Sequence, residues 1–94
     1  MRAMAAPPAD PVKSNALKVL EVLRSSSMDG YRLLKRTGLS ENDLAQAVSE
    51  ELRSVVTVEG SLEPKMIGEA YFSILPSDLG RAEQTFSMLS SFYK

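Results

Sequence analysis

Two short helical patterns that meet at one glycine constrain this chain more than any other feature of its sequence. The run YRLLKRT ends just before Gly38, and the run ENDLAQAV follows it, each with apolar residues at helical spacing. Glycine adopts the left-handed backbone conformation that commonly ends a helix. Ser40 suits the N-cap of the next helix. The sequence therefore predicts two helices joined by a tight turn, the later one spanning about residues 40–54.

The remaining elements follow from apolar periodicity and from helix-start residues. Asp10-Pro11 is a favourable N-cap and first position for a helix that runs to about Ser25. After Arg53 the period changes from 3.6 to 2, and the runs VVTVEG and EAYFSIL predict two strands joined by the loop GSLEPKMIG. A last helix is expected over residues 77–93.

Length and composition indicate one small domain of the α+β class, mainly helical. We expect a flexible arm over residues 1–9 and a single domain over residues 10–94. The chain has no Cys and no His, which excludes thiolate nucleophiles, Cys/His zinc sites and His bases. We therefore expect no enzymatic activity, no cofactor and no metal. Without Cys and without a long apolar run, a cytoplasmic location and no membrane span are expected.

The expected order is helix, helix, turn, helix, strand, loop, strand, helix. With Gly38 in the turn, and with Leu39, Leu44 and Val48 after it, this order resembles the winged helix-turn-helix superfamily, especially bacterial regulators of the MarR and PadR types. The resemblance covers about residues 10–94. It implies a three-helix core, a two-stranded wing, a C-terminal helix, and a DNA-binding transcriptional regulator whose third helix reads the sequence.

The third helix has a polar stripe with the chemistry of a base reader. At about 100° per residue, its apolar residues fall on one side, and the opposite side carries four polar residues. These four are Asn42, Gln46, Ser49 and Arg53. Asn and Gln can pair with adenine at two atoms, and Arg can pair with guanine at two atoms. The alternative interpretation is an ordinary solvated helix face.

Basic residues are concentrated before this helix. Residues 13–36 have a net charge of +4, whereas residues 37–94 have a net charge of −5, and the whole chain has −1 with a pI of about 5.4. We expect contacts with DNA phosphates from the second helix, the N-terminus of the third helix and the wing. The candidates are Arg32, Lys35, Arg36, Ser40 and Lys65. Here the alternative is a solvated basic face.

The low pI, the acidic third helix and an apolar wing favour a second functional hypothesis, a module that binds a protein partner and no DNA. The third helix is acidic, and the loop GSLEPKMIG holds one basic residue, Lys65, together with Glu63, while Glu59 and Glu69 flank the loop. Leu62, Met66 and Ile67 are expected to form an apolar tip on this loop, which suits contact with a protein.

The last helix carries an apolar stripe spaced by three and four residues. Its members are Leu79, Ala82, Phe86, Leu89 and Tyr93. Such spacing suits packing between helices, and terminal helices of the resembled regulators form their dimers. We expect a homodimer through this stripe. The alternative is that the helix folds back onto the first helix of the same chain.

Overall fold

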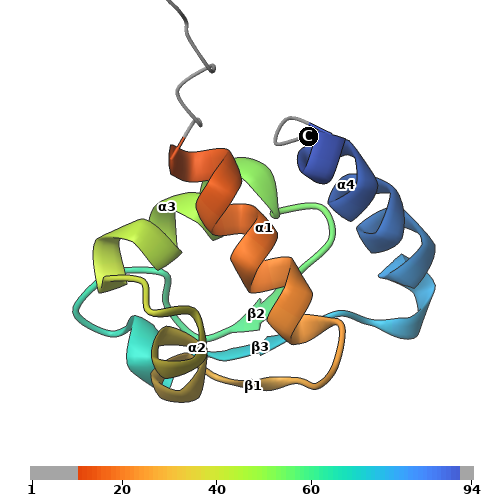
Figure 1. Ribbon diagram of the computed structural model, residues 1–94. Helices are drawn as coiled ribbons and strands as arrows, with labels where there is room; N and C mark the ends of the chain where they lie inside the picture. The colour runs from red at the N-terminus through yellow and green to blue at the C-terminus, as the bar shows by residue number, and fades with distance from the viewer. Residues whose placement is uncertain (1–10, 92–94) are drawn as a thin grey trace, which may run out of the picture.

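The computed structural model describes residues 11–91, and in this range it is mainly helical with one small antiparallel sheet (Figure 1). This confirms the α+β class. The expectations for the arm, for Asp10 and for Tyr93 concern residues outside this range. In chain order the helices and strands are α1 (Pro11–Leu23), β1 (Met28–Asp29), α2 (Gly30–Thr37), α3 (Glu41–Glu51), β2 (Thr57–Glu59), β3 (Tyr71–Ser73) and α4 (Leu79–Ser91). Two short 3-10 helices, η1 (Ile67–Glu69) and η2 (Pro76–Asp78), precede β3 and α4 respectively.

The ends of α2 and α3 are set by local hydrogen bonds. The Asp29 side chain accepts a hydrogen bond from the Arg32 backbone N–H at 2.9 Å, which caps α2. Gly38 has φ 73° and donates its N–H to the Leu34 carbonyl, so it ends α2 in the left-handed conformation. The Ser40 hydroxyl accepts from the Asp43 N–H at 3.1 Å and caps α3. The predicted turn is therefore confirmed.

Helix α3 is shorter than the expected range of 40–54. Its backbone leaves the helical region at Leu52, whose φ is −116°, and residues 53–55 form a turn. The N–H groups of Val55 and Val56 both bond to the Leu52 carbonyl, which reverses the chain toward β2. Both valines are buried, so packing of the turn in the core ends α3 before Arg53.

The sheet has three strands, whereas the sequence predicted a two-stranded wing. The additional strand, β1, pairs with β3 at Met28↔Phe72 and Asp29↔Tyr71. β2 pairs with the other edge of β3, which gives the order β1-β3-β2. The two-residue strand β1 has no β-branched residue and no alternation, so nothing in its own sequence distinguishes it from a loop.

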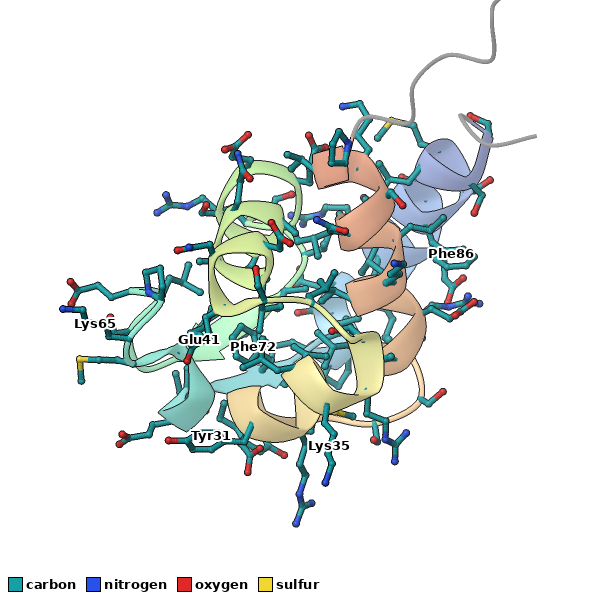
Figure 2. The ribbon with its side chains drawn as sticks, turned by 60° about the vertical axis from the view of Figure 1, so that its left-hand side comes forward. Tyr31, Lys35, Glu41, Lys65, Phe72 and Phe86 are labelled. Atoms are coloured by element: carbon teal, nitrogen blue, oxygen red, sulfur yellow. The ribbon has the colours of Figure 1, made fainter. Side chains whose placement is uncertain are left out.

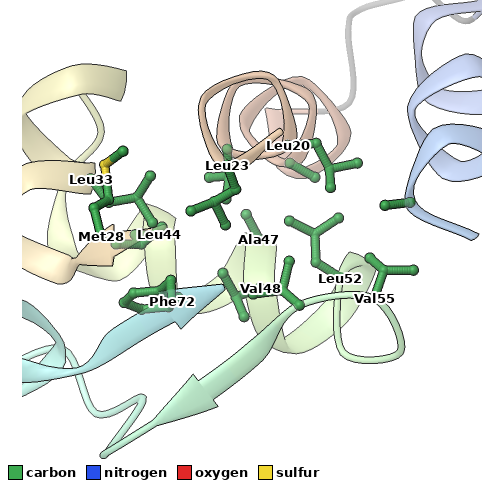
Figure 3. Close-up of a cluster of buried hydrophobic side chains, with 14 of the residues drawn as sticks. Leu20, Leu23, Met28, Leu33, Leu44, Ala47, Val48, Leu52, Val55 and Phe72 are labelled. Atoms are coloured by element: carbon green, nitrogen blue, oxygen red, sulfur yellow. The ribbon is translucent and has the colours of Figure 1, made fainter. Parts of the chain in front are cut away.

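The core lies between α1, α3 and the sheet. Figure 3 shows Leu23, Ala47 and Phe72 meeting between α1 and the strands. Phe72, from the central strand, is fully buried, as is Leu20 from α1. Helix α4 packs on the side of α1 (Figure 1). Residues of α1, β1, α2, α3, η1, β3 and α4 therefore share one apolar cluster, and α1 contacts α2, α3 and α4.

The loop between β2 and β3, residues 60–70, folds back against the start of α2. The Gly30 N–H donates to the Ala70 carbonyl at 2.7 Å, and a Cβ on Gly30 would overlap the Ile67 carbonyl. Ile67 is fully buried and Leu62 packs against the core, so the expected apolar tip is wrong for these two residues. Met66 remains exposed. Packing against the core therefore accounts for Leu62 and Ile67 of this loop.

Candidate nucleic-acid interface

The outer face of α3 is polar, as expected from its spacing. Asn42 and Gln46 are exposed, and Ser49 is half-buried with its hydroxyl donating to the Gln46 carbonyl at 3.3 Å. The opposite face is buried through Leu44, Ala47 and Val48. Two exposed amide side chains therefore lie on one side of α3, one turn apart.

Arg53 does not extend this stripe along the helix. It is exposed, but it lies in the turn that follows α3. There it lines a hollow together with Val48 from α3 and Leu62 from the β2–β3 loop. The stripe predicted from helical geometry is thus confirmed for three residues, and the position predicted for Arg53 is wrong because the helix ends at Glu51.

Helix α2 presents three exposed cations. Within residues 11–91, no carboxylate oxygen lies within 4.0 Å of a charged nitrogen of Arg32, Lys35 or Arg36. Figure 2 shows Lys35 pointing away from the body of the molecule. Other basic residues do have partners, such as Lys13 with Glu51 at 3.3 Å. The charges of α2 are therefore available to an external anion.

The remaining candidates for phosphate contact have different surroundings. Ser40 is exposed at the N-terminus of α3, next to α2, although its hydroxyl already accepts the capping hydrogen bond. Lys65 is exposed on the β2–β3 loop, and Figure 2 shows it at a different edge of the molecule from Lys35. Its exposed neighbours in the loop include Glu63 and Glu69. The loop therefore adds little positive potential.

The charge of this surface is divided between its two helices. Every basic side chain of the pair belongs to α2, while α3 exposes Glu41, Asp43 and Glu50 and contains no basic residue. Asp43 and Glu50 flank the amide stripe on one side, at about 60° around the helix from Gln46 or less. The surface is therefore a positive strip beside a polar helix with an acidic flank.

The stripe of α4 is divided between the core and the surface. Ala82 and Leu89 are fully buried within the chain, which matches the alternative in which the helix folds back. Phe86 is half-buried beneath the Arg24 guanidinium, 4.2 Å from the ring centroid, and Arg24 also pairs with Glu83 at 2.9 Å. Leu79 is exposed. Ala82 and Leu89 are thus not available to a partner, and the homodimer stays a prediction.

One exposed residue of α2 was not among the sequence candidates. Tyr31 is 61% exposed, and its ring covers Gly68 of the β2–β3 loop so closely that a Cβ there would overlap it. It precedes Lys35 by one helical turn, and both labels lie along the same edge in Figure 2. Tyr31 reaches Gly68 because Gly30, its neighbour in the chain, lies close to Gly68. The two glycines are far apart in sequence, so the sequence alone does not predict this contact.

Comparison of the chain with models of protein families, with curated proteins and with solved structures found no match. Among the helices of residues 11–91, none combines the length and the apolar character needed to cross a bilayer. In the same range, no group of three or more acidic side chains is arranged to hold a metal ion.

Proposed function

We propose that this chain is a winged helix-turn-helix protein that binds double-stranded DNA and regulates transcription. The observation that carries the proposal is the unpaired basic surface of α2, which directly precedes a capped α3 with outward-facing amides. The order of elements, α1-β1-α2-α3-β2-β3, and a sheet in which β3 is central support the winged-helix assignment.

In this proposal α3 enters the major groove and reads base edges. The amides of Asn42 and Gln46 each offer a donor and an acceptor, which matches adenine. Arg53 contributes from the turn after α3, where its long side chain can reach guanine without belonging to the helix. Asp43 and Glu50 repel phosphates on one side of the helix, so docking is favoured with this flank directed toward base edges or solvent.

Helix α2 supplies the contacts that are independent of DNA sequence. Its guanidinium and ammonium groups are exposed and form no ion pair within residues 11–91. In such motifs the helix before the recognition helix crosses the DNA backbone. The N-terminus of α3 at Ser40 adds a partial positive charge beside this strip. Association then depends strongly on salt, because each neutralised phosphate releases counterions.

A homodimer completes the proposal. Two copies related by a two-fold axis place their α3 helices in successive major grooves, about 34 Å apart. In this proposal the protein acts in the cytoplasm and needs no cofactor for binding.

The experiment that tests this function uses sites selected from random double-stranded DNA. Binding to the selected site and to unrelated DNA is measured by fluorescence anisotropy across a salt series. Gln46→Ala is expected to weaken binding to the selected site by about 1–3 kcal/mol and to relax the preference. Arg36→Ala is expected to weaken binding to all DNA and to reduce the salt slope by about one unit.

Lys18→Ala is the matched control, because Lys18 is an exposed cation of α1 outside the proposed interface. It removes the same charge and is expected to change binding little. If Lys18→Ala and Arg36→Ala have equal effects, the α2 surface is not the contact. If no sequence is enriched and no binding occurs at low salt, DNA binding is excluded.

The acidic flank of α3 favours a second candidate function, binding of a protein partner. Asp43 and Glu50 are exposed beside the amide stripe, and Met66 is 49% exposed on the nearby loop. Such a surface suits a partner with basic residues and an apolar anchor. This candidate replaces the first if the wild-type protein fails to bind DNA while Asp43→Asn changes binding of a cationic peptide.

A further inference from the structure

The solvent face of the sheet carries a row of side chains that crosses all three strands. Tyr71 of the central strand pairs with Asp29 of β1 on one side and with Glu59 of β2 on the other. Successive residues of a strand point to opposite faces, and Met28 and Phe72, the next pair of the ladder, are both buried in the core. Asp29, Tyr71 and Glu59 therefore face away from the core. We refer to these three residues as the sheet row.

The middle of the sheet row is an exposed aromatic side chain. Tyr71 is 45% exposed although it belongs to the central strand. Within residues 11–91, no Lys or Arg is stacked on its ring. Tyrosine is enriched at protein–protein interfaces, and the face of its ring attracts cations. The ring therefore offers a contact to a group from another molecule.

Two carboxylates flank the Tyr71 ring. Glu59 is exposed and Asp29 is half-buried, and within residues 11–91 no Lys or Arg nitrogen lies within 4.0 Å of either carboxylate. Arg32, the basic residue closest to Asp29 in sequence, donates its backbone N–H to Asp29 and forms no ion pair with it. Glu69, exposed two residues before Tyr71, adds negative charge. This face is therefore complementary to a partner with positive charges.

The spacing of the two carboxylates indicates the conformation of such a partner. Neighbouring strands lie about 4.8 Å apart, so the backbone positions of Asp29 and Glu59 are about 9.6 Å apart across β3. A polyproline II helix has three residues per turn and rises about 3.1 Å per residue, so positions i and i+3 lie on one edge about 9.3 Å apart. A segment in this conformation that runs across the strands places one side chain over each carboxylate. A proline on an adjoining edge of the same helix then contacts Tyr71.

We propose that the sheet row docks a proline-rich segment of a partner protein that carries two arginines three residues apart. Each guanidinium forms paired hydrogen bonds with one carboxylate, and a proline ring packs on Tyr71. The polyproline conformation exists before binding, so little entropy is lost on docking. This inference goes beyond DNA binding and does not depend on it, because the sheet row contains no residue of α2 or α3.

The probe is the capped peptide Gly-Arg-Pro-Pro-Arg-Gly, titrated into the full chain and observed by heteronuclear NMR. It is expected to shift the backbone amide resonances of Asp29, Glu59 and Tyr71 in a saturable manner. In one control peptide, glutamine replaces both arginines. A second control has a single proline, which puts the arginines on different edges of the helix. Both controls are expected to bind about fivefold more weakly, because exposed ion pairs are lost or misplaced.

Three substitutions test the sheet row. Asp29→Asn keeps the oxygen that caps α2, and Glu59→Gln keeps the length of the side chain; each is expected to weaken peptide binding about two- to fivefold. Tyr71→Thr keeps a β-branched residue in the strand and is expected to weaken binding about fivefold. Glu21→Gln is the control, because Glu21 is an exposed carboxylate of α1 far from the row in sequence, and it is expected to change nothing.

The spectrum of each variant shows whether it is folded, and if Tyr71→Thr unfolds, the two charge variants decide. The proposal is overturned if the peptide causes no saturable shifts in the sheet row, or if Asp29→Asn and Glu59→Gln bind it as tightly as wild type. Equal affinity for the glutamine peptide or for the single-proline peptide would also overturn it. A short DNA duplex is titrated in parallel. If the duplex shifts the same three resonances, the sheet row is a nucleic-acid surface and the proposal is refuted.

Discussion

At the scale of single residues, Gly30 connects the helical part of the molecule to the β2–β3 loop. Its N–H bonds to Ala70, and its missing side chain allows the Ile67 carbonyl to approach. Gly30→Ala is therefore expected to lower the free energy of unfolding by about 1–3 kcal/mol, because the overlap involves backbone that cannot move cheaply. Urea denaturation at equilibrium measures the change.

Gly80 is the matched control for this substitution. It lies in α4, and a Cβ there would meet open space. Gly80→Ala is expected to raise the free energy of unfolding by about 0.5–1 kcal/mol, because alanine loses less backbone entropy in a helix. Equal effects of the two substitutions would contradict the close approach at Gly30.

At the scale of elements, α4 is held to α1 by one face only. Leu89 is fully buried, while its neighbour Met88 is 54% exposed. Leu89→Ala is expected to lower the free energy of unfolding by about 2–5 kcal/mol, because it leaves a cavity in the shared core. Met88→Ala is expected to change it by less than about 0.5 kcal/mol. Thermal and urea unfolding measure the free energy of unfolding of both variants. Equal losses for Leu89→Ala and Met88→Ala would mean that α4 does not pack on α1 through the face that carries Leu89.

At the scale of the whole molecule, the proposed homodimer must use residues that the monomer leaves exposed. Leu79, 45% exposed at the start of α4, is the described member of the predicted stripe that meets this condition best. The wild type is expected to have twice the chain mass of 10.3 kDa by light scattering at tens of micromolar. Leu79→Glu is expected to shift the mass toward the monomer, because a charge buried at a two-fold axis faces its own copy.

Ser87→Glu is the control, since Ser87 is an exposed position of α4 outside the stripe. It adds the same charge and is expected to leave the mass unchanged. A wild type that has the monomer mass throughout a dilution series would refute the homodimer, and DNA binding would then have to be explained with one copy of α3.

The local turn structure could be predicted from sequence because its causes lie within a few residues. Gly38 acts through its own backbone angles, and Asp29 and Ser40 accept hydrogen bonds from N–H groups three positions away. The orientation of α3 was predictable for a related reason, since helical periodicity alone separates Leu44 from Gln46. The proposed DNA contacts of these residues are predictions that the fold does not test.

Only tertiary packing decided the remaining features, because each depends on residues far apart in the chain. β1 forms because Met28 pairs with Phe72 of β3. Ile67 is buried because Gly30, which has no side chain, allows the β2–β3 loop to pack against the start of α2. The apolar stripe of α4 had two possible partners, a second chain or α1, and the same spacing fits both. Arg53 lies outside α3 because Val55 and Val56 are buried and their N–H groups bond to the Leu52 carbonyl, which ends the helix early. Amphipathic spacing shows which side of an element is apolar, but only the folded chain determines what covers it.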